Sequence, residues 1–530
     1  MPLTREGKRQ TPLSMKSSES VLIYDATLRD GTQGEGISFS AEDKILVADK
    51  LDAFGVDYIE GGWPGSNPRD MIFFDLAKKR TFKQAKITAF GSTRRPNLGV
   101  EDDPQLATLL EAETPVVTIF GKTWLLHVTE VLRTSPECNL EMIEDSVRFL
   151  KAAGREVIYD AEHFFDGYRE DPDYAIETLK GAAAGGADWV VLCDTNGGSQ
   201  VTWLREVVER VVEVMRPLPV GIHAHNDSGL GVALSQVAVE AGARMVQGCQ
   251  NGYGERVGNA NLTTVMANLH FKMGFEMGCS GKMGELSNLA HEIDKLANLI
   301  PNTKAPYVGR SAFAHKGGVH ANAAQKVARS YEHIEPGLVG NSQRILLSDM
   351  AGSSSVAMKA HDMGIEIDPK SSEMQEFIAL LKEREAKGYE YENADASLQV
   401  LLSRHFHGTK DNFKLVSYRT ISEVVRDKHE NISEAVVKIR VKDDEELKIS
   451  VAESTGPVGA LDHAMRIAFG AHFSELRSVE LIDYKVRVLN PEEAAASKVR
   501  VFITSTDHEN NSWDTVGVSE NIVEASWEAI

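Results

Sequence analysis

The chain has 530 residues, of which 42% are hydrophobic, and this length predicts two to four folded units with sizeable cores. Its net charge of -21 argues against nucleic acid or an anionic membrane surface as a partner. No apolar run reaches about 18 residues, so the sequence predicts no membrane span and no membrane partner.

The N-terminal residues 1–18 are polar, and no apolar stretch follows their basic residues, so they do not form a secretory signal. We expect a disordered N-terminal extension there. The four cysteines lie far apart in the sequence and form no Cys-x-x-Cys pair. They are predicted to be reduced core thiols of a cytoplasmic protein.

Eight short apolar runs follow from residue 21, separated by stretches with helical spacing such as Glu42–Phe54 and Leu230–Ala241. The runs are Val21–Asp25, Val56–Glu60, Lys86–Phe90, Val116–Phe120, Glu156–Asp160, Trp189–Cys193, Val220–His225 and Arg244–Cys249. Continuous apolar strands are typical of a parallel sheet that is covered on its outer face. Eight strand–helix units predict an α/β fold, a closed (β/α)8 TIM barrel over residues 19–285, with an open doubly wound sheet as the alternative.

Polar residues cluster where the predicted strands end. Barrel enzymes place their chemistry on the face formed by the carboxyl ends of the strands. The residues at or just past these ends are Asp30, Glu60, Glu162, Asp194, His223, His225 and Glu255.

His223 and His225 form the sharpest local signal. Residues i and i+2 of a strand point to the same side, so both imidazoles can reach one cation. An isolated His-x-His is equally well explained as two polar residues at a strand end. The polar, glycine-containing loop that follows, Asn226–Gly231, favours the metal-binding interpretation because it can turn over a bound ligand.

The loop after the first strand contains Arg29 and Asp30, which offer a fixed cation and a hard oxygen ligand. Alone, such a pair is more often a surface ion pair. A closed barrel brings strand 1 beside strand 8 and within reach of strand 7, so Asp30 can share a metal with the two histidines. Glu60 ends strand 2 and needs a partner if buried, for which Arg29 is the nearest candidate, and Glu162 ends strand 5 and could do acid–base work.

The pattern changes after about residue 285. Residues 286–395 are predicted to form helical linker subdomains. Residues 396–530 contain strands followed by a helix, and this strand–strand–strand–helix unit occurs twice. We expect a separate α+β domain there, which carries no constellation of residues suited to catalysis.

Five ordered motifs, ahead of the terminal repeat, identify what the chain resembles. They are the TLRDG loop, the IEGGWP segment, HAHND, GYGERVGNANL and GGVHANA. Together they resemble the acetyl-CoA-dependent condensing branch of the metal-dependent lyase and synthase barrels, which comprises the 2-isopropylmalate, homocitrate and citramalate synthases. The likeness runs from about residue 20 to the C-terminus and is greatest to the long citramalate synthases. It implies condensation of acetyl-CoA with pyruvate and water to give (R)-citramalate and CoA, on the route to isoleucine.

The resemblance also implies the roles of individual residues. Asp30, His223 and His225 would bind a divalent metal ion, with Asn259 close to it. Two imidazoles and one carboxylate suit Zn²⁺, Mn²⁺ and, less naturally, Mg²⁺, so the sequence leaves the metal open. Arg29 would steady the substrate carbonyl oxygen.

Further roles follow from the same resemblance. Glu60 would hold the arginine, and Glu162 with His320 would take a proton from the acetyl methyl group. His320, from the linker subdomains, would reach the barrel of a partner subunit, which implies a homodimer. The terminal repeat would bind isoleucine or leucine as a feedback inhibitor.

One position departs from the family pattern. Asn322 stands where several relatives have Asp, so a carboxylate that would orient the His320 base is missing or is supplied elsewhere. Asn322 and Tyr331 are expected to lie in the substrate cleft. Two alternative functions stay open at this point: a synthase that accepts 2-oxoisovalerate or another 2-oxo acid, and a regulatory amino-acid-binding protein with an inactive barrel.

Overall fold

The computed structural model describes residues 20–315, 330–345, 352–425, 430–441, 446–470, 472–490, 497–508 and 511–530. Its contacts divide the chain into two compact units. One consists of Met1–Phe313 with Glu332–Ser342, and the other of Ala314–Tyr331 with Gln343–Ile530. None of the described helices is long and apolar enough to cross a membrane.

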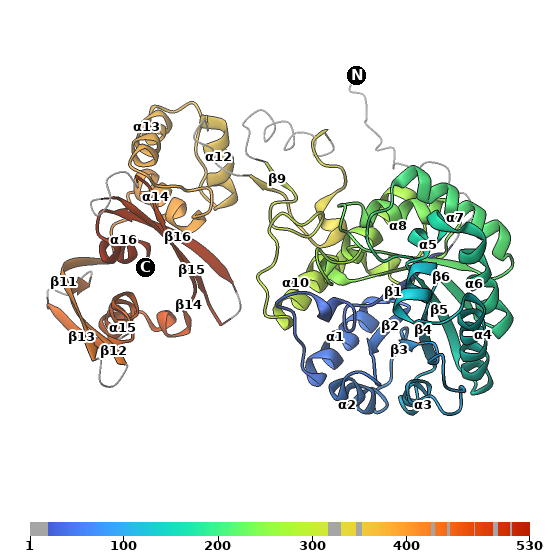
Figure 1. Ribbon diagram of the computed structural model, residues 1–530. Coiled ribbons are helices and arrows are strands. Elements are labelled where there is room, and N and C mark those ends of the chain that lie inside the picture. Colours follow the sequence, from blue (N-terminus) through green and yellow to red (C-terminus); the bar gives the residue numbers. More distant parts are fainter. Residues whose placement is uncertain are drawn as a thin grey trace, which may run out of the picture. The chain divides into compact units, whose positions relative to one another are not determined.

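The first unit contains a closed barrel of eight parallel strands in the order β1 to β8 (Figure 1). The strands are β1 (Leu22–Asp25), β2 (Tyr58–Gly62), β3 (Lys86–Ser92), β4 (Val116–Lys122), β5 (Glu156–Glu162), β6 (Trp189–Asp194), β7 (Val220–Ala224) and β8 (Met245–Gly248). The predicted TIM barrel is confirmed, and each observed strand end lies within two residues of its prediction. Strands β2, β3, β4 and β5 each end two residues further than predicted, which brings Lys122 and Glu162 to the rim.

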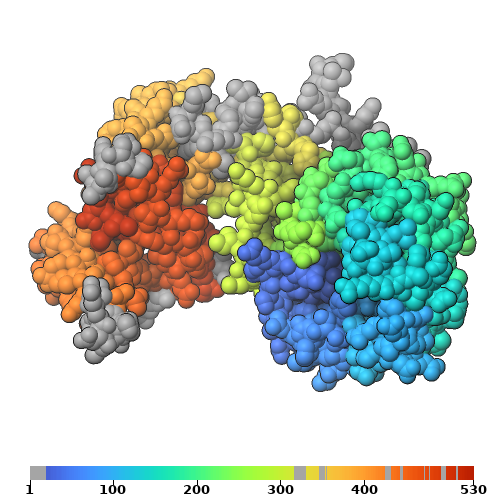
Figure 2. Space-filling view, viewed as in Figure 1, coloured from blue at the N-terminus to red at the C-terminus, as the bar shows by residue number. Residues whose placement is uncertain are grey.

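Helices surround the barrel, whose atoms are coloured from blue to green in Figure 2. They are α1 (Ala41–Phe54), α2 (Pro68–Ala77), α3 (Pro104–Glu111), α4 (Pro136–Ala152), α5 (Phe164–Glu170), α6 (Pro172–Gly185), α7 (Val201–Met215), α8 (Gly231–Glu240), α9 (Leu262–Asn268) and α10 (Leu286–Leu296). Four of them begin with the same local chemistry, a capping side chain followed by proline. Asn67, Asp103, Ser135 and Asp171 each accept a backbone N–H bond at the start of a helix. Proline suits the next position because the N–H it lacks has no partner in the first turn.

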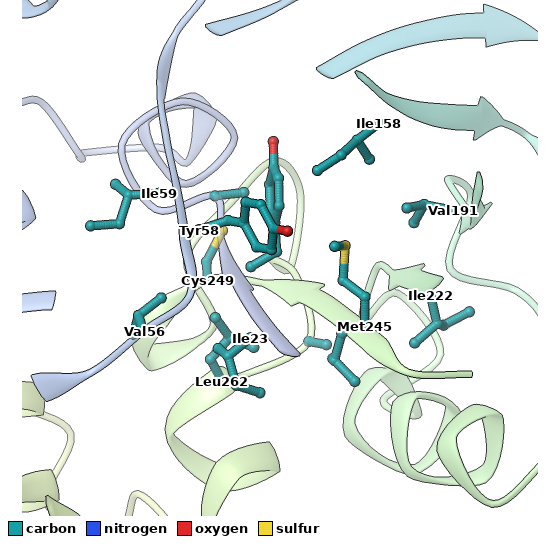
Figure 3. Packing of buried hydrophobic residues seen from close by; sticks show 14 of the residues in the cluster. Ile23, Val56, Tyr58, Ile59, Ile158, Val191, Ile222, Met245, Cys249 and Leu262 are labelled. Carbon is teal, nitrogen blue, oxygen red and sulfur yellow. The ribbon is translucent and has the colours of Figure 1, made fainter. Parts of the chain in front are cut away.

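The core lies on both sides of the barrel wall. Figure 3 shows side chains of this cluster, among them Tyr58 of β2 and Met245 of β8. Residues that face the barrel axis alternate with residues that pack under the helices, because successive side chains of a strand point to opposite faces. All four cysteines are free thiols; Cys193, Cys249 and Cys279 are buried as predicted, whereas Cys138, in the first turn of α4, is partly exposed rather than in the core.

The second unit holds a helical part and a repeated sheet. The helices α12 (Ser353–Asp362), α13 (Ser372–Ala386) and α14 (Asp395–Phe406) share one apolar cluster. The first sheet has β11 (Phe413–Val425), β12 (Glu430–Val441) and β13 (Lys448–Ser454), followed by α15 (Pro457–Phe469). The second has β14 (Glu480–Val488), β15 (Val499–Thr506) and β16 (Ser512–Ser519), followed by α16 (Ile522–Ala529). The predicted repeat of three strands and a helix is therefore confirmed.

Candidate metal centre and active site

Three predicted metal ligands converge at the carboxyl end of the barrel. The Nε2 atom of His223 lies 3.4 Å from Nε2 of His225 and 3.4 Å from Oδ2 of Asp30. One ligand atom from each residue lies within 4.8 Å of the others, and all three residues are buried. The spacing allows a single cation to contact two imidazole nitrogens and a carboxylate oxygen.

A chain of hydrogen bonds orients His223 from inside the barrel. Its Nδ1 lies 2.8 Å from Oε1 of Gln247 on β8, and Gln247 Nε2 donates to Asp160 Oδ1 on β5 at 2.9 Å. An acceptor at Nδ1 leaves the Nε2 lone pair for a metal, which is the usual arrangement around a histidine ligand. Burial raises the pKa of Asp160 to about 7, although the charge of His223 opposes this shift.

The two imidazoles differ in their electrostatics. Burial disfavours the charged form of His223, but the hydrogen bond and charge of Asp30 raise its pKa above the ordinary value. Burial and the neighbouring His223 lower the pKa of His225 to about 4, so this ring is neutral and can offer a lone pair. Burial also opposes ionisation of Asp30, yet Arg29 and His223 hold its pKa well below the usual range. The cluster thus presents an ionised carboxylate and at least one neutral imidazole.

The chemistry of the neighbouring loop fits a cation. Asn259 pairs with His225 through an isolated bridge, and its Nδ2 donates to the backbone oxygen of Tyr253 at 3.1 Å. Oδ1 of Asn259 and Nδ1 of His225 are buried and have no hydrogen-bond partner in the part of the chain that the structure describes. Gly254, with a φ of +137°, permits this approach, since a Cβ there would lie 2.2 Å from Asn259 Nδ2. An unpartnered buried oxygen beside two imidazoles is a suitable further ligand, so the residues present fit a divalent metal ion.

Arg29 is held beside the cluster by the partner that its sequence position predicted. Its Nε contacts Glu60 Oε1, and its Nη1 lies 3.5 Å from Oδ2 of Asp30. The guanidinium carbon stacks 3.6 Å from the centre of the Phe90 ring. The other Glu60 oxygen accepts a 2.5 Å bond from Tyr24. These contacts fix the orientation of the Arg29 guanidinium at the rim of the barrel, where its positive charge is available to a carbonyl oxygen.

Glu162 lies at the end of β5, where its side chain contacts Nζ of Lys122 from the end of β4. Its neighbour His163 adopts a left-handed φ of 56°, which is rare outside glycine and is often found at functional sites. His163 Nδ1 lies 3.2 Å from Asp166, in agreement with a structural role for that histidine.

The remaining predicted site residues are not brought to this cluster by described contacts. His320 and Asn322 lie outside the described residues. Tyr331 has a 45% exposed side chain and belongs to the second compact unit. The predicted places of these three residues in the substrate cleft stay predictions.

The sequence did not identify the residues that hold the functional side chains in place through hydrogen bonds and ion pairs. Lys122, Gln247, Asp160 and Tyr24 are all strand residues whose partners come from other strands. One signal was present for Gln247, Asp160 and Tyr24: each is polar within a predicted strand, at a position that strand alternation assigns to the barrel interior.

Residues 20–292 match the HMGL-like family, residues 307–388 the homocitrate synthase post-HMGL domain-like family, and residues 392–530 the LeuA allosteric (dimerisation) domain. An (R)-citramalate synthase of Aquifex aeolicus is 53% identical over 97% of this chain and 97% of its own. One of Geobacter sulfurreducens is 49% identical over 96% of both chains. A probable 2-isopropylmalate synthase of Methanopyrus kandleri is 32% identical over 96% of this chain and 97% of its own.

Proposed function

We propose a function from one premise: the chain belongs to the HMGL-like family, in the branch of the (R)-citramalate synthases. The proposed reaction joins acetyl-CoA to pyruvate and, with water, yields (R)-citramalate and free CoA. The observation that carries it is the convergence of Asp30, His223 and His225 beside the fixed cation of Arg29. Such a set suits an acid whose carboxylate and ketone oxygens lie on adjacent carbons.

We propose that Asp30, His223, His225 and Asn259 hold a divalent metal ion, which supplies Lewis-acid polarisation of the 2-oxo acid. Arg29 donates to the ketone oxygen and faces the charge that develops there when the new carbon–carbon bond forms.

Two further groups complete the proposed site. Glu60 keeps the guanidinium of Arg29 in place through their buried contact. Glu162, with His320, takes the proton from the acetyl methyl group.

The proposed acceptor is pyruvate rather than a longer acid. The barrel interior beside Arg29 is occupied by aromatic side chains: Phe90 and Phe120 stack at 5.6 Å, and Trp63 packs edge-on against both. An enclosed apolar site discriminates by size, at about 1–3 kcal/mol per added methyl group. These rings favour a small acceptor.

A panel of 2-oxo acids tests this proposal. We expect kcat/KM for pyruvate to exceed that for 2-oxoisovalerate at least about tenfold, because two extra methyl groups must be placed beside the aromatic rings. Release of CoA from acetyl-CoA, followed with a thiol reagent in Mn²⁺- or Mg²⁺-loaded protein, measures the preference. The opposite preference would refute the acceptor, whereas no release with any acid would favour the inactive-barrel alternative.

The match to a LeuA allosteric (dimerisation) domain indicates that residues 392–530 form a regulatory module of that type. We propose that the chain is a homodimer and that isoleucine or leucine inhibits it through this domain. We also propose a cytoplasmic location, since four free thiols, three of them buried, suit a reducing compartment.

A cavity of about 640 Å³ in this domain has the chemistry of an amino-acid site. Asp462 and Arg466 of α15 line it, together with the apolar side chains Val458, Val479 and Leu481. Asp462 Oδ2 accepts a 2.7 Å bond from Arg466, while its Oδ1 is buried without a partner in the described chain. The Asp462 carboxylate suits an ammonium group, and the apolar lining suits a branched side chain. We propose this cavity as the effector site.

Asp462→Asn tests the effector site in the intact chain. We expect the isoleucine or leucine concentration for half-inhibition to rise about 10–100-fold, because a hydrogen bond to a charged group contributes about 1.5–3 kcal/mol. Inhibition curves for both amino acids measure the change. Asp483→Asn is the matched control, since Asp483 pairs with Lys485 outside the cavity lining and should keep wild-type inhibition. Equal inhibition of wild type and Asp462→Asn would show that the site lies elsewhere.

A further inference from the structure

A lysine that the proposed reaction does not use lies at the carboxyl end of the barrel. Lys122 and Glu162 are the last residues of β4 and β5 and are register partners in the parallel sheet. Lys122 Nζ contacts Glu162 Oε2, and the two side chains are only 14% and 24% exposed. The pair is thus largely enclosed, whereas an isolated ion pair on the protein surface is solvated and contributes little.

Strand alternation directs this pair into the mouth of the barrel. Thr118 of β4 accepts a 2.9 Å bond from Tyr24 across the interior, and Asp160 of β5 is bonded from β8, so both face the axis. Side chains of a strand alternate with a period of two. Lys122, four residues after Thr118, and Glu162, two residues after Asp160, therefore face the axis at its carboxyl rim.

The same rim holds the proposed metal ligands. His225 follows His223 by two residues, as Glu162 follows Asp160, and the interior Gln247 joins the lower members of these two pairs. Cys193 on β6 lies between the two groups. Burial raises the pKa of its thiol, and the charges of Asp160, Glu162 and Asp30 add to that shift. Glu162 and the proposed metal ligands thus face the barrel axis at the same rim.

Lys122 has more hydrogen-bond donors than its carboxylate partner uses. An ammonium group carries three N–H donors. In the described part of the chain, Glu162 is its only hydrogen-bond partner, and the face of the Phe120 ring lies 5.3 Å from Nζ. The remaining donors are available to an oxygen of the substrate that the adjacent carboxylate deprotonates.

We propose that Lys122 is a catalytic residue that binds the thioester oxygen of acetyl-CoA and stabilises the enolate formed when Glu162 removes a methyl proton. This inference rests on the proposed function. The methyl C–H bond breaks, its proton goes to the Glu162 carboxylate, and its electron pair forms the C=C bond while the carbonyl π pair moves to oxygen. The negative charge passes from Glu162 to the thioester oxygen, so the net charge of the site does not change. The Lys122 ammonium group contacts both groups.

In the second half of the step, the negative charge moves from the thioester oxygen to the ketone oxygen of the 2-oxo acid. The enolate carbon bonds the ketone carbon of the 2-oxo acid, the thioester carbonyl re-forms, and the ketone π pair moves to its oxygen beside Arg29. Lys122 is therefore needed where the charge is greatest on the thioester oxygen. Donors fixed at such a position favour the transition state over the bound substrate.

Lys122→Met tests the proposal in the intact, metal-loaded enzyme. We expect kcat to fall about 10²–10³-fold, as for loss of one oxyanion donor. The KM for pyruvate and the affinity for Mn²⁺ should stay within about twofold of wild type. The isotope effect on kcat with methyl-deuterated acetyl-CoA should increase, because proton transfer becomes the slowest step. Lys122→Arg should recover part of the rate, since it keeps a charged donor.

Lys86→Met is the matched control, because Lys86 pairs with Glu156 at the opposite end of β5, at 2.6 Å, and should leave kcat unchanged. A Lys122→Met enzyme with a wild-type rate would refute the role. So would a lower rate accompanied by a lower melting temperature and an unchanged isotope effect, because the ion pair would then be structural. Absence of CoA release by the wild type with pyruvate would refute the proposed acceptor instead. The same isotope comparison with the accepted 2-oxo acid would still decide the role of Lys122.

Discussion

His223→Ala is expected to lose the bound metal ion and at least about 10³-fold in kcat while the protein stays folded. The imidazole is one of the four proposed ligands, and its loss leaves Asp30, His225 and Asn259 to hold the ion. Lewis-acid stabilisation is worth several kcal/mol, and each 1.36 kcal/mol is a factor of ten in rate. The fold should survive, because the main structural cost is an unpaired Gln247, about 1–3 kcal/mol.

Metal content by mass spectrometry, Mn²⁺ titration calorimetry and CoA release together measure this result. His291→Ala is the control: His291 is an exposed residue of α10 whose Nε2 contacts the backbone oxygen of Val308, and its loss should affect neither metal nor rate. A His223→Ala protein that keeps full metal content and activity would disprove the ligand assignment.

Glu60→Gln is expected to destabilise the protein by about 3–5 kcal/mol and to lower kcat strongly. Glu60 is fully buried between Arg29 and Tyr24, and removing one partner of a buried ion pair leaves an uncompensated charge. The guanidinium would then be drawn toward Asp30, its remaining carboxylate neighbour, and away from the ketone oxygen. Urea unfolding and kcat/KM for pyruvate measure the two effects.

Asp70→Asn separates the two consequences. Asp70 pairs with the buried Lys44 near the start of the barrel helices, so its loss also unpairs a buried cation. We expect a comparable loss in the free energy of unfolding, with kcat within about threefold of wild type. If Glu60→Gln behaves in the same way, with stability lost but activity kept, Glu60 does not position Arg29 for catalysis.

The strands and the cluster of Asp30, His223 and His225 could be predicted, mostly because their signals are local. Each strand is a short apolar run, and the His223–His225 pair sits at the end of one of them. The Asp30 contact followed from closure of the barrel alone. The repeated C-terminal unit was equally local, since each copy shows its three strands and helix in order.

The residues that orient His223 and pair with Glu162 could not be predicted in the same way. In the sequence, Gln247 is a single polar residue in an apolar strand. Only the closed barrel places it between His223 and Asp160. The β4–β5 register places Glu162 beside Lys122, and neither residue alone predicts this contact. The extra residues at the ends of these strands decide that contact, and strand ends are the least certain part of a sequence reading.

Strand β5 carries a glutamate at each end, and the two have separate consequences for engineering. Glu156, at the amino end, contacts Tyr58 and Lys86, while Glu162, at the carboxyl end, contacts Lys122. The amino-end contacts can be optimised for thermal tolerance without disturbing the reactive end, about six residues away along a rigid strand. Substitutions selected for new 2-oxo acid acceptors should therefore accumulate at the carboxyl rim. Stabilising substitutions made first at the amino end can offset the stability that those substitutions lose.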